Sequence, residues 1–479
     1  MKRFVLAYVF AATTVGTAGA FAGCSSSSSG NNASDAGTSS DATSVNQDGG
    51  SEDATVDSGV AIPSTTAGDA LTFVLAAMNG TKVTGADVTA HFTTDFITAV
   101  GGASAIEALF TQLAANKQWV VAGFDGKPTE LSLVAIVTQN QAEYHRLSIG
   151  CDATTSLIDG LNIDIAPELD PTLQSWDAID KAIGRGGASE FSELAATIDD
   201  DAGCTAIHSL SPDTSRALGS QFKLYVLATL AQSIDTGVHA WTDQIAIQDQ
   251  YKSLPSGTYQ NEPVGTMFSA EKFADQMISV SDNTAADHLI WFVGRSNVES
   301  MLTTAQHHDP TQNEPFLTTR ELFDLKLMVS EPARQTYIAD SIADKRTVLA
   351  GYDTTLDPRT YTGTWLNPID IDQLEWFATP NDLCKVMTVL KTYADKPTTT
   401  KVYDVLAINP GIADDAKLFS YIGYKGGSEP GVLTLSWLLK RASDSTWRFY
   451  SVEWNDPNNA LDEATLVYIA GAGRALLAK

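Results

Sequence analysis

A serine and a lysine, Ser220 and Lys223, stand three positions apart at the start of an apolar helical segment that continues through Leu230. Residues at positions i and i+3 of a helix lie on the same face, so the hydroxyl and the amine are expected to point the same way. A lysine in a partly desolvated site can lose its proton near neutral pH and accept the serine proton. The first turn of a helix also offers backbone N–H groups that stabilise a developing oxyanion. The pair therefore predicts a nucleophile and its base, although this spacing alone is weak evidence.

A second motif, Ser281-Asp282-Asn283, follows a segment with helical periodicity. Its serine hydroxyl could relay a proton to a leaving group, while the asparagine amide orients the substrate and the lysine. A Ser-Asp pair is also an ordinary helix cap. Both interpretations can hold at once.

A third motif, Lys425-Gly426-Gly427, lies inside a strand-like run. A lysine there can hold a substrate carboxylate, and the glycines let the strand come close to a bound ligand. Taken by itself, Lys-Gly-Gly is usually a turn.

In this order, on helix, loop and terminal strand, the three motifs resemble those of the class A serine β-lactamases and penicillin-binding proteins, over residues 205–479. The resemblance implies a serine hydrolase that forms an acyl-enzyme with β-lactam amides or related esters and needs no cofactor. The residues that it assigns are Ser220 as nucleophile, Lys223 as base, Ser281 as proton shuttle, Lys425 as carboxylate and transition-state anchor, Asn283, Gly427 and Ser428 as substrate-binding residues, and the N–H groups of Ser220 and Ser428 as the oxyanion hole.

Two departures from the family pattern concern substrate recognition and turnover. Gly426 stands where the family usually has a hydroxyl-bearing residue. The deacylating glutamate of class A enzymes lies in a Glu-x-x-x-Asn pattern within an omega loop, and the corresponding segment 306–320 is short. Glu314 is the candidate there, but the Asn is missing. Slow deacylation is therefore expected, and the alternatives are an envelope protein that traps β-lactams without efficient turnover or a scaffold with a decayed site.

A two-domain protein fits these departures best. The chain resembles the β-lactamase-like hydrolase of the clavulanic-acid biosynthetic cluster, which joins a steroid-isomerase-like, cystatin-like α+β domain to a β-lactamase-like α/β sandwich without the omega-loop glutamate. The resemblance predicts a small domain at 65–172 and a hydrolase domain at 173–479. Aromatic residues of the first domain are interpreted as core: Phe73, Phe96 and Trp119.

Residues 1–23 have the basic start, apolar stretch and small residues of an export signal. The signal ends at a lipobox-like Cys24 followed by five serines, so we expect lipidation of Cys24 and attachment to a membrane. An ordinary secretory signal is the alternative. Residues 24–64, rich in Ser, Asp and Gly, are expected to form a disordered tether. The predicted location is the bacterial cell envelope, periplasmic or surface-exposed.

The formal net charge of -28 argues against nucleic-acid binding, and we expect a monomer. Among the cysteines after Cys24, an exported protein can form one disulfide, and Cys151 with Cys204 is the expected pair, leaving Cys384. No spacing of Cys or His indicates a metal site, and His307-His308 is interpreted as a surface pair. Residues 175–201 are expected to form a connecting helix with an acidic end.

Overall fold

A computed structural model describes residues 60–115, 118–199, 203–414 and 416–479. The predicted signal, Cys24 and most of the tether lie outside these residues, so lipidation and envelope location stay predictions. No helix of the described chain is long and apolar enough to cross a membrane.

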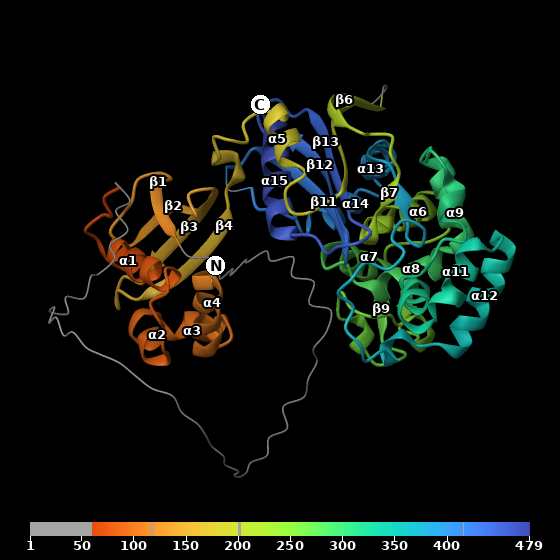
Figure 1. The fold of residues 1–479 in the computed structure, drawn as a ribbon, viewed down its shortest axis with the longest axis horizontal. Helices are drawn as coiled ribbons and strands as arrows, with labels where there is room; N and C mark the ends of the chain where they lie inside the picture. The colour runs from red at the N-terminus through yellow and green to blue at the C-terminus, as the bar shows by residue number, and fades with distance from the viewer. Residues whose placement is uncertain (1–59, 116–117, 200–202, 415) are drawn as a thin grey trace, which may run out of the picture.

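The first part of the described chain is a small α+β domain. Its elements are α1 (Thr66–Met78), α2 (Gly85–His91), α3 (Thr94–Ala99), α4 (Ala103–Ala115), β1 (Trp119–Phe124), β2 (Ser132–Gln139), β3 (Glu143–Cys151) and β4 (Ile158–Ile165). The strands form an antiparallel sheet in sequential order, with the helices on one face (Figure 1). The apolar positions of α1, such as Leu71 and Val74, pack with Leu133 and Val137 of β2. Phe96 and Trp119 are buried here, as predicted, and Phe73 packs against this core.

A larger domain is built on an antiparallel sheet of order β11-β12-β13-β5-β6. The strands are β5 (Glu190–Asp199), β6 (Gly203–Leu210), β11 (Phe419–Glu429), β12 (Val432–Arg441) and β13 (Trp447–Asn455), and the helices on one face are α5 (Trp176–Ala182) and α15 (Glu463–Leu476). Neighbouring residues of β12 serve opposite layers: Trp437 packs with Leu466 of α15, and Leu438 packs with the helical region on the other face. Because both faces are covered, β12 is buried along nearly its whole length.

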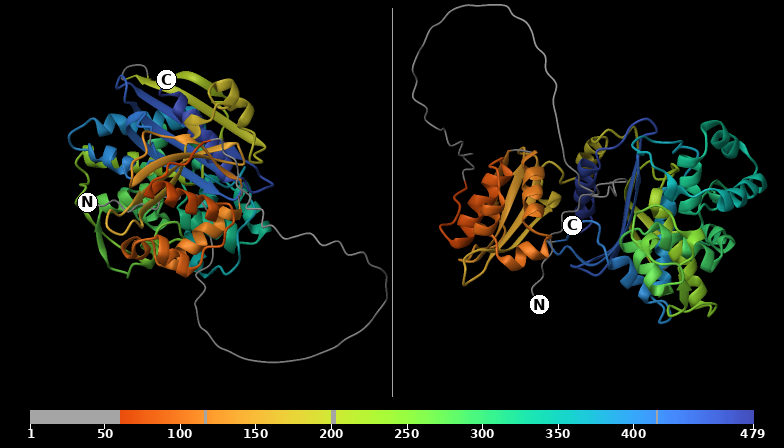
Figure 2. Two further views of the ribbon diagram at one scale, coloured as in Figure 1. Left: turned by 90° about the vertical axis from the view of Figure 1, so that its left-hand side faces the viewer. Right: turned by 90° about the horizontal axis from the view of Figure 1, so that it is seen from below.

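The helical region covers the other face of the sheet. Its helices are α6 (Lys223–Asp235), α7 (Ala270–Ser279), α8 (Asn283–Val293), α9 (Arg295–Thr304), α10 (Thr319–Phe323), α11 (Glu331–Ala339), α12 (Ile342–Thr355), α13 (Pro380–Ala394) and α14 (Lys401–Ala407). The short elements are β7 (Arg216–Ala217) paired with β10 (Phe377–Ala378), β8 (Gln244–Ala246) paired with β9 (Met267–Ser269), and the single turns η1 (Pro167–Leu169), η2 (Gly219–Phe222), η3 (Asp249–Tyr251), η4 (Tyr259–Asn261), η5 (Pro310–Asn313), η6 (Asp324–Met328) and η7 (Pro358–Thr360). Figure 2 (right) shows the large sheet between α15 and this region. The predicted mixed fold, a small α+β domain followed by a sandwich of α and β layers, is confirmed.

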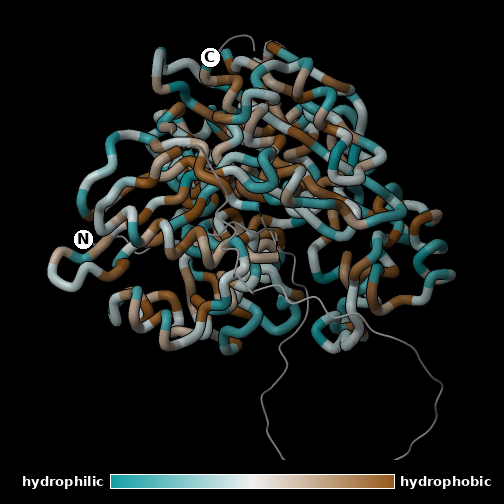
Figure 3. Tube along the Cα trace, turned by 60° about the vertical axis from the view of Figure 1, so that its left-hand side comes forward, coloured by the Kyte–Doolittle hydropathy of each residue, from teal (hydrophilic) through white to brown (hydrophobic). Residues whose placement is uncertain are grey.

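The two domains keep separate apolar cores. Figure 3 shows hydrophobic stretches running through the interior of both. They meet where α15 approaches the small sheet, and the backbone N–H of Tyr144 donates to the hydroxyl of Tyr468 at 2.8 Å.

Two expectations are wrong: the pairing of the cysteines and the helix at residues 175–201. The disulfide joins Cys204 of β6 to Cys384 of α13, whereas Cys151 is an unpaired, buried residue in the core of the small domain. Residues 175–201 form the short helix α5 and then the strand β5, not one helix. In β5, Leu194 and Ala196 face the helical region and Ala195 faces α15, so its continuous apolar run is that of a strand buried on both faces.

Candidate active site

Ser220 and Lys223 lie where η2 passes into α6. The Oγ of Ser220 is 3.0 Å from the Nζ of Lys223, and the lysine side chain is fully buried while the serine is partly exposed. Gly219 makes the turn possible, because its φ of +51° is in the left-handed region. The structure thus brings the first motif together as the helical spacing predicts.

Lys223 is held in a cage of acceptors. Its Nζ lies 2.6 Å from the Ser281 carbonyl oxygen and 2.7 Å from Asn283 Oδ1. Burial lowers its pKa to about 7, against the opposing charges of Asp282 and Asp287. The Nζ also lies 3.0 Å from Ser220 Oγ and from Ser281 Oγ. When the amine is neutral, its two N–H groups can donate to the two closest acceptors. Its lone pair is then free to accept the proton of the Ser220 hydroxyl.

The second motif combines both of its predicted roles. Asp282 caps α8 by accepting from the N–H of Ala285 at 2.8 Å, and its other oxygen accepts from the N–H of Thr258 and Tyr259. The loop comes so close that a Cβ on Gly257 would stand 2.1 Å from Asp282 Oδ2. With Asp282 fixed in this way, Ser281 is held at a left-handed φ of +57° beside the lysine.

The third motif reaches the same place from the edge of the large sheet. The Nζ of Lys425 is 3.0 Å from Ser281 Oγ, which is also 3.0 Å from the Nζ of Lys223. Burial, together with the charge of Lys223, lowers the pKa of Lys425 well below its usual value. Ser281 therefore lies between two amines and can pass a proton between them and a leaving group.

The strand carrying Gly427 runs directly against the nucleophile turn. A Cβ on Gly427 would lie 2.1 Å from the Leu218 carbonyl oxygen and 2.7 Å from the Ser220 nitrogen. The Ser428 nitrogen is equally near, 3.0 Å from where a Cβ of Gly219 would stand. The two amides assigned to the oxyanion hole thus belong to adjoining segments.

The structure also explains why this motif has a glycine at position 426 instead of the family's hydroxyl-bearing residue. A Cβ there would lie 2.2 Å from the Tyr424 hydroxyl, so a larger residue at this position needs Tyr424 to move.

Glu314 has no contact of this kind. It ends η5, and no hydrogen bond within the described chain joins its side chain to Ser220, Lys223 or Ser281. Its neighbour Asn313 is instead tied to the backbone of Phe377, at 2.8 and 2.9 Å. A role for Glu314 as deacylating base stays a prediction.

Sequence reasoning gave no role to several residues that support this site. Ser256 Oγ donates to the Ser281 carbonyl oxygen at 2.7 Å. Asp287 accepts from the N–H of Thr319 at 2.7 Å and of Arg320 at 2.9 Å, and burial raises its pKa to about 7. Ser256, Asp287, Thr319 and Arg320 lie outside the three motifs, and their contacts join segments that are far apart in the chain.

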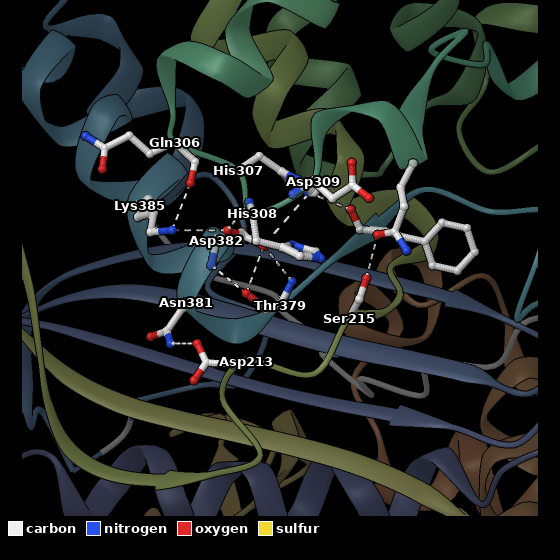
Figure 4. Close-up of polar contacts among 12 residues, drawn as sticks. Asp213, Ser215, Gln306, His307, His308, Asp309, Thr379, Asn381, Asp382 and Lys385 are labelled. Carbon is white, nitrogen blue, oxygen red and sulfur yellow. Dashed lines mark hydrogen bonds and ion pairs between the residues drawn. The ribbon is translucent and has the colours of Figure 1, made fainter. Parts of the chain in front are cut away.

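The interpretation of His307-His308 as a surface pair is wrong for His307. Its ring is buried and its Nε2 lies 2.8 Å from the Phe377 carbonyl oxygen, while His308 Nδ1 lies 2.6 Å from Asp382 Oδ2 (Figure 4). The sequence did not indicate these contacts because the partners lie far away along the chain: Phe377 is 70 positions from His307, and Asp382, in the capping box of α13, is 74 positions from His308.

Among the residues that the structure describes, two groups of His and acidic residues have possible ligand atoms within 4.8 Å of one another. They are His307, His308 and Asp382, and Asp180, Glu193 and His208. In each group a ring nitrogen already contacts a carboxylate: Asp382 for His308, and Asp180, at 2.8 Å, for His208. The expectation that the protein needs no metal stays a prediction.

Comparison with known proteins gives two family matches. The profile of the Beta-lactamase enzyme family matches residues 178–427, and the profile described as ORF 12 gene product N-terminal matches residues 62–156. No curated protein matches the chain.

Similar solved structures include two β-lactamases and PBP-A. The β-lactamase from Sphaerobacter thermophilus DSM 20745 has 17% identity, covers 63% of this chain and 96% of its own, and has a TM-score of 0.44. The β-lactamase from Xanthomonas campestris pv. campestris str. ATCC 33913 has 18% identity, 62% and 95% coverage, and a TM-score of 0.43. PBP-A has 14% identity, 64% and 95% coverage, and a TM-score of 0.43. At such identities and TM-scores, no activity is transferred from these structures to this chain.

Proposed function

The chain belongs to the beta-lactamase enzyme family, and from this premise we propose that it is a serine hydrolase that forms an acyl-enzyme on Ser220. Its substrates are β-lactam amides or related esters. The observation that carries the proposal is the buried Lys223, whose two acceptors leave its lone pair for the Ser220 hydroxyl.

In the acylation step, Ser220 Oγ attacks the carbonyl carbon while its proton passes to Lys223 Nζ. The tetrahedral oxyanion is stabilised by the backbone N–H groups of Ser220 and Ser428. As the C–N or C–O bond breaks, Ser281 donates its proton to the departing nitrogen or oxygen and recovers one from Lys223. Lys425 attracts the substrate carboxylate to the edge of β11.

The second half-reaction is proposed to be slow. Water must attack the ester on Ser220, and in the described chain the Glu314 side chain has no hydrogen bond to the catalytic serines or to Lys223. Lys223 can still accept a proton from water, but among the described residues no carboxylate is hydrogen-bonded to the side chains of Ser220, Lys223 or Ser281, where it could position that water.

The closer relationship that we propose is with the two-domain hydrolase of the clavulanic-acid cluster. It is supported by the small domain, by the separate match of residues 62–156, and by the short segment 306–320. Weak esterase or β-lactamase activity is the property expected of such a relative.

Intact-mass measurement after incubation with a penicillin and with an activated ester tests the acyl-enzyme. Wild type is expected to gain one adduct, and Ser220→Ala none. Ser215→Ala is the matched control, because the Ser215 hydroxyl bonds Gln312 and touches no catalytic residue. An adduct that forms on Ser220→Ala, or no adduct and no hydrolysis with any substrate in wild type, contradicts the proposal. An adduct lifetime of hours would favour a β-lactam trap.

A further inference from the structure

A lysine and two glutamates are buried together behind the nucleophile turn. Lys326 comes from η6, Glu375 from the loop before β10, and Glu429 from the end of β11. The Nζ of Lys326 donates to Glu375 Oε1 at 3.0 Å and to Glu429 Oε1. The side chains of Lys326 and Glu375 are fully buried, and that of Glu429 is 6% exposed. The cluster touches none of the reacting groups, so the acylation steps above do not use it.

The cluster nevertheless holds both segments of the oxyanion hole. Glu375 Oε2 accepts from the N–H of Gly219 at 3.2 Å and from that of Trp376 at 3.1 Å. Glu429 directly follows Ser428, on the same strand face as Gly427. One ionic cluster therefore links the residue before the nucleophile to the residue after the second oxyanion donor.

The charges of the cluster do not balance when every group is ionised. Two carboxylates would face one ammonium group in a buried site, where an uncompensated charge is costly. Burial and the charge of Glu375 raise the pKa of Glu429 well above its usual value. Burial would lower the pKa of Lys326, but its two glutamates raise it overall. A neutral cluster needs one proton on the carboxyl pair, with Lys326 charged.

We propose that Lys326, Glu375 and Glu429 are positioning residues: they hold the amides of Ser220 and Ser428 at the spacing that acylation needs, in the state that carries one proton on the glutamate pair. This inference rests on the acyl-enzyme proposed above. The groups that face Glu429 are Lys326 from η6 and Glu375 from the loop before β10. Raising the pH removes the shared proton, leaves a buried negative charge beside the turn, and loosens the oxyanion hole.

The acylation rate constant and the affinity for reversible binding should be measured across pH in four proteins. Glu429→Ala is expected to lower the acylation rate about 10- to 100-fold near neutral pH, because a small displacement of donors is costly. Glu429→Gln, which keeps the shape and cannot ionise, should restore most of that loss and remove the alkaline fall of wild type. Glu453→Gln is the control, since Glu453 is a buried glutamate of β13 outside this cluster.

Three kinetic results would overturn the inference. They are acylation of Glu429→Ala at the wild-type rate, an alkaline fall that persists unchanged in Glu429→Gln, and a loss confined to deacylation.

Two measurements need no substrate and separate this inference from the acyl-enzyme proposal. The infrared difference spectrum of wild type minus Glu429→Gln is expected to show the band of one protonated buried carboxyl group at neutral pH, because other buried carboxyl groups, such as Glu453, contribute equally to both spectra. Amide hydrogen exchange at Gly219 and Ser220 should be faster in Glu375→Gln than in wild type. Failure of wild type to form any adduct contradicts the acyl-enzyme, whereas absence of the band or unchanged exchange contradicts the positioning cluster.

Discussion

At the scale of single residues, the site depends on two buried lysines. Charging both at once is costly, because the two ammonium groups are desolvated and repel each other. Lys223 and Lys425 contact the same oxygen, Ser281 Oγ, each at 3.0 Å. Burial lowers both pKa values, and their mutual repulsion adds to the effect on Lys425. The neutral amine is best assigned to Lys223, because its two close acceptors match two N–H groups. Lys425 is the lysine proposed to meet the substrate carboxylate, whose negative charge would favour the protonated form of the Lys425 amine.

The rate of acylation should therefore rise with pH. Lys223 acts as a base only when neutral, so acylation is expected to increase as the pH rises through its pKa of about 7, before the alkaline fall attributed above to the glutamate cluster. Lys223→Arg, whose guanidinium stays protonated, should lose this rise and lower the rate about 10²- to 10⁴-fold. Stopped-flow acylation from pH 5 to 9 measures both effects. A Lys223→Arg variant with the wild-type pH profile would assign the proton to another group.

The sequence could predict contacts between residues that are close along the chain, but not contacts between distant segments. Ser220 and Lys223 are three apart on one helix, so local geometry alone brings them together. Lys326 lies 49 positions from Glu375 and 103 from Glu429, and no periodicity links them. His307 was missed for the same reason, because its partner Phe377 is 70 positions away.

At the scale of elements, the large sheet places a catalytic lysine at one edge and the disulfide at the opposite edge. β11, at one edge, carries Lys425, whereas β6, at the other edge, carries Cys204. The predicted strand around Lys425 is confirmed as part of β11, whereas β5 precedes the helical region and lies within residues that were expected to form a helix. Its pairing with β13 is long-range, and its apolar run resembles a buried helix until the sheet is known.

The Cys204–Cys384 disulfide is expected to stabilise the domain without affecting acylation. It closes a loop of 180 positions, so its removal frees a large unfolded-state entropy. Replacing both cysteines with serine should lower the free energy of unfolding by about 2–4 kcal/mol, measured by urea denaturation. Cys151→Ser, in the small domain, is the control for a change of a buried thiol. A slower acylation of the double variant at a temperature where it stays folded would show that the two edges of the sheet are coupled.

At the scale of the whole molecule, the two domains meet through polar and apolar contacts. The Tyr144 N–H donates to the Tyr468 hydroxyl, and Ile165 at the end of β4 packs against the apolar residues around α15. All residues assigned to catalysis lie in the large domain. The small domain therefore behaves as a separately packed unit docked against α15, and its boundaries at 65–172 and 173–479 stay predictions.

This arrangement predicts two unfolding transitions in calorimetry of the whole chain, because the apolar cores do not merge. Tyr468→Phe leaves the Tyr144 N–H without its partner, which costs about 1–3 kcal/mol if the group stays buried. Each kcal/mol should lower the transition of the small domain by about 4–8 °C. Acylation of Ser220 is expected to be unchanged in this variant, since Tyr468 faces η1 and the small sheet rather than the helical region. A single cooperative transition, or slower acylation in Tyr468→Phe, would instead mean that the small domain shapes the catalytic site.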